Sequence, residues 1–154
     1  MEVEDLSLGI VPVRKVNDQY EILLCKSGRY NYYLFPKGHP EPNECKIVSA
    51  QRELLEETGH RANLFWYGET WGPDSAEAKE LPLLSYYYQT STKRVHKSVI
   101  FFLAEVEYEC PIQDTDEVSG VEWFLADENI APKLHHAENI EHYLTHILPL
   151  LRRN

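Results

Sequence analysis

The segment GHPEPNECKIVSAQRELLEETG, Gly38 to Gly59, decides the fold of this chain and the chemistry expected of it. Pro42-Asn43 stands before a run of helix-forming residues, and a glycine ends that run. These two signals predict a helix over about Glu44 to Thr58, with Gly59 as its stop. The helix carries an unusual concentration of acidic side chains, and it is the centre of the interpretation that follows.

Three glutamates of this helix share one face. At about 100° per residue, Glu53, Glu56 and Glu57 fall within an arc of about 100°. Like charges at these spacings destabilise a helix by a few tenths of a kcal/mol per pair, so the cluster needs a reason. A hard divalent cation is one reason, since Mg²⁺ prefers carboxylate oxygen and also accepts substrate phosphates. Taken alone, a solvated acidic patch with Arg52 offsetting the repulsion is the commoner explanation.

The residues around the cluster follow a longer pattern of fixed types at fixed gaps. Glycine and glutamate are separated by five residues, and seven residues later comes Arg-Glu-apolar, any residue, Glu-Glu, any residue and Gly. The pattern falls on Gly38, Glu44, Arg52, Glu53, Leu54, Glu56, Glu57 and Gly59. It resembles the Nudix box, the signature of the Nudix hydrolases. Only the next position departs, with His60 where an aliphatic residue is usual, and this bears on the packing of the following strand.

The rest of the chain is predicted to supply strands on both sides of the box helix and one more helix. Leu6 to Val13 and Tyr20 to Cys25 form a hairpin across Asn17-Asp18. Further strands are predicted at Tyr32–Phe35, Ala62–Thr70, Leu83–Thr90, Ser98–Val106 and Gly120–Phe124, and a surface loop is predicted at Gly72–Glu80. The segment Ala137–Leu151 is predicted to form an amphipathic helix. Its apolar residues recur at helical spacing, namely Ile140, Leu144, Ile147, Leu148 and Leu151. This order predicts an α/β (α+β) sandwich with a mixed sheet between helices, the Nudix fold, in one domain over residues 1–154.

The resemblance implies roles for individual residues. Glu53, Glu56 and Glu57 match the family's Mg²⁺ ligands, with Mn²⁺ as an alternative ion, and Glu53 or a later glutamate is the candidate base for the attacking water. Gly38 matches the glycine whose backbone carbonyl completes a metal site. Arg52 matches the arginine that orients a catalytic carboxylate through a bidentate ion pair.

Three stretches outside the box resemble the asymmetrical diadenosine tetraphosphate hydrolases. In FPKGHPEPNE, Lys37 is expected beside the metal site as a phosphate ligand. In KRVHKSVIFFLAEV, Lys93, His96 and Lys97 are candidates for binding the phosphates remote from the reacting one. The alternative is that this basic stretch is an ordinary solvated hairpin end. In DEVSGVEWF, Glu117 is the candidate for a further carboxylate over the metals, as ligand or as base.

Aromatic residues precede the basic stretch. On a strand, Tyr86 and Tyr88 share one face, and one of them is expected to stack on adenine. The default for most tyrosines is partly buried packing with the hydroxyl at the rim. The histidines near the last helix are expected to be surface residues, namely His135, His136 and His142.

The preferred function is Mg²⁺-dependent hydrolysis of diadenosine tetraphosphate to ATP and AMP by attack of water at phosphorus. The main alternative within the same chemistry is removal of pyrophosphate from RNA 5′ ends. Hydrolysis of ADP-ribose, nucleotide sugars or diphosphoinositol phosphates also stays open. A different class is a Nudix domain that binds nucleotides without cleaving them, but such domains have usually lost box carboxylates, and here all of them are present.

Composition limits the partners. The formal net charge of −10 argues against DNA and other non-specific nucleic-acid binding, which needs a basic face. No apolar run reaches the length of a membrane span, and Met1–Asp5 is acidic where a signal peptide would be basic. Three widely separated cysteines fit a reducing compartment. We therefore expect a cytoplasmic monomer that acts on a small nucleoside polyphosphate.

Overall fold

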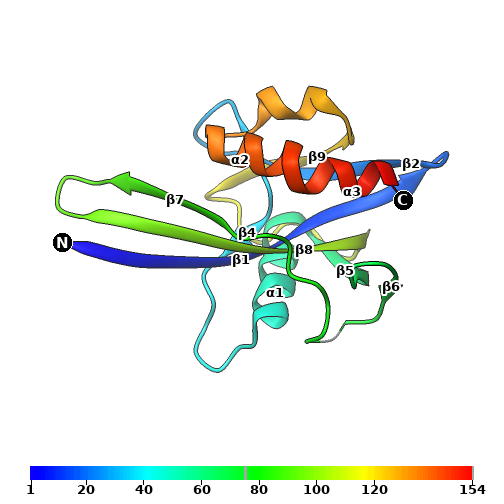
Figure 1. Cartoon of the computed structure of the whole chain (residues 1–154), viewed down its shortest axis with the longest axis horizontal. Coiled ribbons are helices and arrows are strands. Elements are labelled where there is room, and N and C mark those ends of the chain that lie inside the picture. Colours follow the sequence, from blue (N-terminus) through cyan, green and yellow to red (C-terminus); the bar gives the residue numbers. More distant parts are fainter. Residues whose placement is uncertain (75, 154) are drawn as a thin grey trace.

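A twisted sheet forms the middle of the molecule (Figure 1), as described for residues 1–74 and 76–153 in a computed structural model. It begins with the hairpin of β1 (Glu2–Val16) and β2 (Gln19–Ser27), which meet where Val16 pairs with Gln19. Both residues of the turn have positive φ, 51° at Asn17 and 65° at Asp18. This conformation suits a two-residue hairpin and residues of the Asn and Asp type. The predicted hairpin is confirmed, and both strands extend beyond the expected limits.

The remaining strands lie on both sides of this hairpin in the order β3-β2-β1-β8-β5-β6, while β4 pairs with β1, β7 with β8 and β9 with β2. Their bounds are β3 (Tyr33–Leu34), β4 (Lys37–Gly38), β5 (His60–Trp66), β6 (Trp71–Gly72), β7 (Leu84–Gln89), β8 (Arg94–Tyr108) and β9 (Val118–Leu125). Strands β1 and β8 are parallel from Glu2↔Arg94 to Val13↔Glu105, and the other pairs are antiparallel. The sheet is therefore mixed, as predicted.

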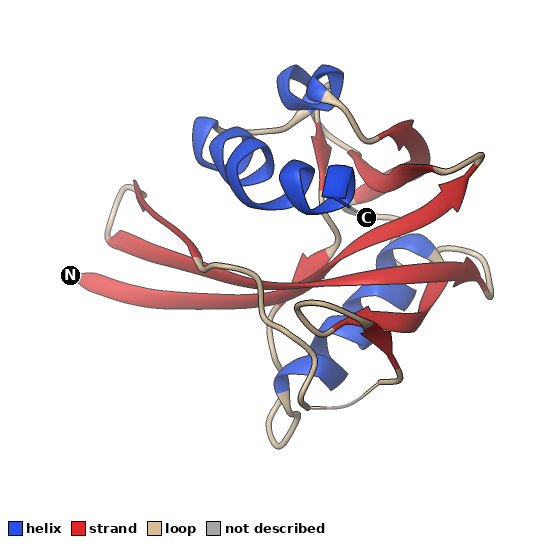
Figure 2. Cartoon of the chain, turned by 45° about the vertical axis from the view of Figure 1, so that its right-hand side comes forward, coloured by secondary structure: helices blue, strands red, loops and turns tan. Residues whose placement is uncertain are grey.

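Helix α1 (Lys46–Thr58) covers one face of the sheet (Figure 2). Its apolar side, with Ile47, Ala50 and Leu54, packs in a core with residues of β1, β5 and β8. The helix ends at Gly59, whose φ of 67° is left-handed and whose N–H donates to the Leu55 carbonyl, so the predicted stop is confirmed. It begins after Cys45, slightly later than expected.

The opposite face of the sheet is covered by the C-terminal segments (Figure 1). These are η1 (Glu128–Lys133), α2 (Ala137–His142), the π-helical turn η2 (Tyr143–Ile147) and α3 (Leu148–Arg153). The π turn adds a residue to the helical repeat. Tyr143 is fully buried, whereas Leu144 is exposed despite its place in the apolar pattern. Helices on both faces confirm the predicted sandwich, and the uniform amphipathic pattern was wrong at Leu144.

Two further features complete the fold. The stretch predicted as a surface loop begins in β6 and continues as turns to Glu80, which forms a bridge with Phe102, while Ser75 lies outside the described residues. Ala78 within it is buried. Across the described part of the chain, every helix is too short or too polar to traverse a bilayer.

Candidate active site

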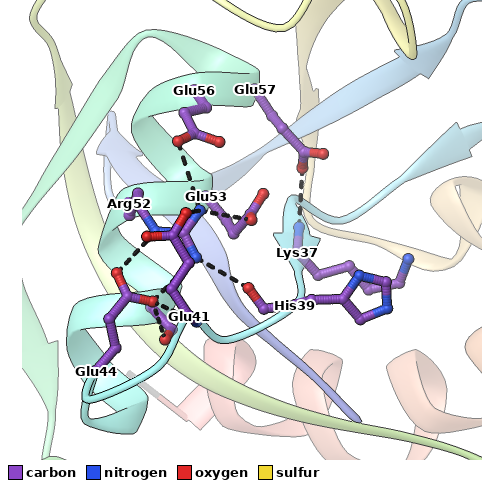
Figure 3. Close-up of polar contacts among 9 residues, drawn as sticks. Lys37, His39, Glu41, Glu44, Arg52, Glu53, Glu56 and Glu57 are labelled. Carbon is purple, nitrogen blue, oxygen red and sulfur yellow. Dashed lines mark hydrogen bonds and ion pairs between the residues drawn. The ribbon is translucent and has the colours of Figure 1, made fainter. Parts of the chain in front are cut away.

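The three glutamates of α1 line a cleft of about 430 Å³. Its other walls are the loop before this helix, Ser7 of β1, Lys97 of β8, and Asp114 and Glu117. Figure 3 shows Glu53, Glu56 and Glu57 on the side of the helix that looks toward Lys37 and His39. Their burial differs, because Glu57 is only 8% exposed whereas the Glu56 side chain is 37% exposed. The cleft thus combines one buried and one partly solvated carboxylate with a third, Glu53, between them.

Arg52 ties the loop before α1 to the helix. Its guanidinium binds Glu44 through two nitrogens, at 2.8 and 3.0 Å, and donates to Glu53 Oε1 at 2.9 Å and to the His39 carbonyl at 2.9 Å (Figure 3). The bond from Arg52, followed by that from Ser49 Oγ, lowers the pKa of Glu44 to about 2. The bidentate partner of Arg52 is therefore Glu44, while Glu53 receives a single hydrogen bond.

Gly38 is required by the close approach of the loop to α1. A Cβ atom at this position would overlap the carboxyl group of Glu53. The neighbouring Asn43 has φ of 68°, a left-handed conformation that asparagine tolerates better than most residues. The absence of a side chain at Gly38 lets its backbone lie directly against a box carboxylate.

Glu57 is a buried carboxylate that lacks a full counter-charge. Its Oε1 accepts the backbone N–H of Lys37 at 2.9 Å. Burial nevertheless raises the pKa of Glu57 to about 8, with Glu53 adding to the rise. Burial also raises the pKa of Glu53, although Arg52 opposes the shift. A bound divalent cation would supply the charge that stabilises both groups as carboxylates.

Asp114 joins Glu57 and Glu117 in a group able to hold a metal ion. One carboxylate oxygen from each lies within 4.8 Å of the others. The loop that carries Asp114 is fixed to the end of α1, because the N–H groups of Gln113 and Asp114 both donate to the Glu56 carbonyl at 2.9 Å. Glu117 was a candidate from the sequence, whereas Asp114 was not. The three oxygen donors fit a hard cation.

Two lysines lie across the cleft from these carboxylates. Burial lowers the pKa of Lys37, and the neighbouring Lys97 lowers it further. Lys97 is 7% exposed and donates to Ser7 Oγ at 2.6 Å and to Asp5 Oδ2 at 3.2 Å. Two ammonium groups near each other in a cleft lined by Gly38 and the box glutamates provide an attachment for an anion beside the carboxylates.

The other members of the basic stretch lie away from the cleft. Lys93 is exposed in the turn between β7 and β8. His96 points to the face of β8 opposite Lys97, where it contacts Ser85 Oγ at 2.6 Å and Glu4 at 2.8 Å. The structure thus brings Lys97 to the box residues and does not bring Lys93 or His96 there.

A row of aromatic rings lies beside the lysines. Tyr86 pairs with Lys97 across β7 and β8, and burial raises its pKa. The ring centroid of Tyr86 lies 5.6 Å from that of His136 and 6.5 Å from that of Tyr88, which is 41% exposed. The row continues through His135, whose ring is 3.9 Å from His136 and stacks on Tyr32 at 3.9 Å.

Two of the three histidines differ from expectation. His142 is buried, and its ring nitrogen bonds to the Pro82 carbonyl at 2.6 Å, so its assignment to the surface was wrong. His135 is partly buried, and burial lowers its pKa, with His136 and Lys37 adding to the shift. The paired histidines just before a helix were the available sequence signal for this aromatic row.

Comparison with known proteins agrees with the geometry. The family model described as NUDIX domain matches residues 6–145. The chain is 31% identical over 108 residues to the bis(5′-nucleosyl)-tetraphosphatase [asymmetrical] of Rattus norvegicus, a match that covers 70% of this chain and 65% of the length of that relative.

Solved structures show the same fold. A binary complex of the C. elegans Ap4A hydrolase matches with a TM-score of 0.62 and 22% identity, over 91% of this chain and 93% of that one. A NUDIX hydrolase from Nitrosomonas europaea matches with a TM-score of 0.59 and 25% identity, over 92% of this chain and 89% of that one. The box glutamates line one cleft, and the family model spans most of the length of the chain. The chain therefore belongs to the NUDIX domain family.

Proposed function

We propose that this protein is a metal-dependent hydrolase that cleaves diadenosine tetraphosphate asymmetrically into ATP and AMP. The observation that carries the proposal is a single cleft in which the box glutamates face Lys37 and Lys97. A polyphosphate needs both kinds of group, since the carboxylates bind cations that bridge to phosphate and the lysines bind phosphate directly. The similarity to the rat tetraphosphatase supports the choice of substrate.

Mg²⁺, or Mn²⁺ in its place, is the proposed cofactor. Glu57, Asp114 and Glu117 are one proposed set of ligands. Glu53, Glu56 and the Gly38 carbonyl border the same cleft and are proposed to complete the metal-binding region. When bound, such ions neutralise the diphosphate, polarise phosphorus and make water a better nucleophile.

The reaction requires a base and a fixed arrangement of carboxylates. We assign the base to Glu53 or Glu117, which would take a proton from the attacking water. The water oxygen forms a bond to the phosphorus next to one adenosine, the bridging P–O bond breaks, and ATP leaves with the electron pair. Arg52 holds Glu53 by one hydrogen bond and the loop through Glu44, so its proposed role is to position the carboxylate.

The substrate's remaining parts have candidate partners among two lysines of the cleft and the tyrosines beside Lys97. Lys37 and Lys97 are proposed to bind phosphates beyond the reacting one. One of Tyr86 and Tyr88 is proposed to contact adenine by stacking, worth about 1–3 kcal/mol per base. We do not assign Lys93 or His96 to this substrate, because Lys93 lies in the turn between β7 and β8 and His96 points to the face of β8 opposite Lys97.

We further propose a cytoplasmic monomer that acts on free nucleotides. The thiols of Cys25, Cys45 and Cys110 are all free, which suits a reducing compartment. The net charge of −10 is unfavourable for DNA and for long RNA.

Product analysis tests the proposal. Purified protein with Mg²⁺ is incubated with diadenosine tetraphosphate, 5′-triphosphorylated RNA, ADP-ribose and nucleoside triphosphates, with Glu57→Gln as the control for contaminating activity. Equal amounts of ATP and AMP from the first substrate, reduced by orders of magnitude in the variant, support the assignment. Faster cleavage of RNA or ADP-ribose would move the protein to another branch of the same chemistry. Tight nucleotide binding without turnover in Mg²⁺ or Mn²⁺ would refute catalysis.

A further inference from the structure

Asp5 contacts two residues that line the cleft, Lys97 and His39. It stands opposite Lys97 in the parallel pairing of β1 and β8, so the two side chains share one face of the sheet. Asp5 Oδ2 accepts from Lys97 Nζ at 3.2 Å, and Oδ1 lies 2.7 Å from His39 Nε2. Because an ionised carboxylate has only acceptors, His39 is the donor in this contact.

The environment of Asp5 favours its charged form. Burial alone would raise its pKa, but the bonds and charges of Lys97 and His39 outweigh burial and lower it. The carboxylate therefore holds two groups that approach from different elements. His39 follows β4, and its carbonyl accepts from Arg52, so the contact ties β1 to the loop that leads into the box helix.

Lys97 is held at the cleft with one donor left over. An ammonium group has three N–H donors. One goes to Asp5 and one to Ser7 Oγ at 2.6 Å. Among residues 1–74 and 76–153, no acceptor for the third donor is within bonding range, and Lys97 lines the cleft beside Lys37. A lysine restrained in this way loses less side-chain freedom when it binds a phosphate than one in open solvent.

We propose that Asp5 is a positioning residue for polyphosphate binding, which holds the Lys97 ammonium toward the cleft and fixes His39 against β1. The inference rests on the proposed function only in that the cleft accepts a chain of phosphates. Asparagine at this position would keep the shape of the side chain but would lose the charge. Its oxygen could still accept from Lys97 and its N–H₂ group could donate to a neutral His39 ring, so the main loss is the charge that holds the Lys97 ammonium.

Steady-state kinetics on diadenosine tetraphosphate give the first test. Asp5→Asn is expected to raise KM about tenfold, the size of one charge-assisted hydrogen bond, with kcat changed by less than about twofold. The matched control is Glu4→Gln. Glu4 precedes Asp5 on β1, points to the other face of the sheet and contacts His96 at 2.8 Å. Glu4→Gln should therefore leave KM and kcat unchanged.

A double-variant cycle distinguishes positioning from a general structural effect. If Asp5 acts through Lys97, Asp5→Asn should have no further effect on KM in a Lys97→Met protein. The same rise in KM in both backgrounds would overturn the proposal, and so would an unchanged KM in the single variant. If Asp5→Asn does not fold, Ser7→Ala removes the other acceptor of Lys97 and should raise KM about threefold. An unchanged KM in that variant would also overturn the idea.

Calorimetric binding of inorganic tripolyphosphate with Mg²⁺ separates this inference from the proposed function. Asp5→Asn is expected to weaken that binding about tenfold, and Glu4→Gln is expected to leave it unchanged. If the wild-type protein cleaves no diadenosine tetraphosphate yet shows this loss, the substrate assignment fails and the positioning role stands. Equal affinity in wild type and Asp5→Asn would refute the positioning role whatever the substrate.

Discussion

Replacing Glu57 by glutamine should stabilise the metal-free protein even as it abolishes activity. Glu57 is buried, and its pKa is raised from 4.5 to about 8. Below pH 4.5 the carboxyl is protonated in both the folded and the unfolded chain, so its burial does not lower the free energy of unfolding through ionisation. As the pH rises toward 8, only the unfolded chain ionises freely, and stability is lost. At about 1.4 kcal/mol per pH unit, the loss reaches roughly 5 kcal/mol above pH 8.

Glutamine avoids this cost because it keeps the shape of Glu57 and can still accept the Lys37 N–H. Urea unfolding in EDTA measures the difference at two pH values. At pH 5 the variant should gain about 1 kcal/mol or less over wild type, and at pH 8.5 roughly 4–5 kcal/mol. Saturating Mg²⁺ should restore stability to the wild type and add little to the variant, since a ligand stabilises only a state that binds it.

Glu56→Gln is the control, because it removes a partly solvated carboxylate from the same helix. It should leave the pH dependence of unfolding close to that of wild type. A difference between Glu57→Gln and wild type that is the same at pH 5 and pH 8.5 would refute the reasoning about burial. Equal stabilisation of both proteins by Mg²⁺ would refute the assignment of Glu57 as a metal ligand.

Two substitutions test the parts that support the glutamates. Gly38→Ala should displace Glu53, since the new Cβ would overlap its carboxyl group, and we expect turnover to fall by about 100-fold with a loss of about 1–3 kcal/mol in stability; normal kcat in steady-state assays would contradict this. Arg52→Lys should raise the pKa of Glu44 from about 2 toward 4.5, because lysine lacks the planar fork that binds both oxygens. Carboxyl-detected NMR titration measures that pKa, and an unchanged value would show that Ser49 and the Glu41 N–H hold it instead.

Local signals in the sequence were sufficient for the hairpin and the box helix. Asn17-Asp18 adopts the positive φ angles of a two-residue turn, and Gly59 ends α1 in the left-handed conformation. Both outcomes depend on the backbone preferences of the residues themselves. The helix then places Glu53, Glu56 and Glu57 on one face by its own periodicity, so their grouping needed no tertiary information.

The flanking residues depended on packing that the sequence does not express. Lys97 and His96 are neighbours in a basic stretch, but successive side chains of a strand point to opposite faces, so only one of the two could reach the cleft. Asp114 enters the site because its loop is bonded to the end of α1. His142 is buried, and its ring nitrogen bonds to the Pro82 carbonyl 60 residues earlier in the chain. Each of these positions is fixed by a contact between distant parts of the chain.

The parallel pairing of β1 with β8 also has a consequence for folding kinetics. Glu2 pairs with Arg94 and Val13 with Glu105, so the longest pairing in the sheet joins segments that are about 90 residues apart. Contacts at such separation require closure of a large loop, and the entropy lost on closure comes before the stabilisation by strand pairing, which slows folding. Until β8 is available, the apolar residues of β1 are exposed, and Glu2, Glu4 and Asp5 near its start oppose association with other chains. Stopped-flow refolding should therefore show formation of the β1–β2 hairpin before the β1–β8 pairing that limits the rate.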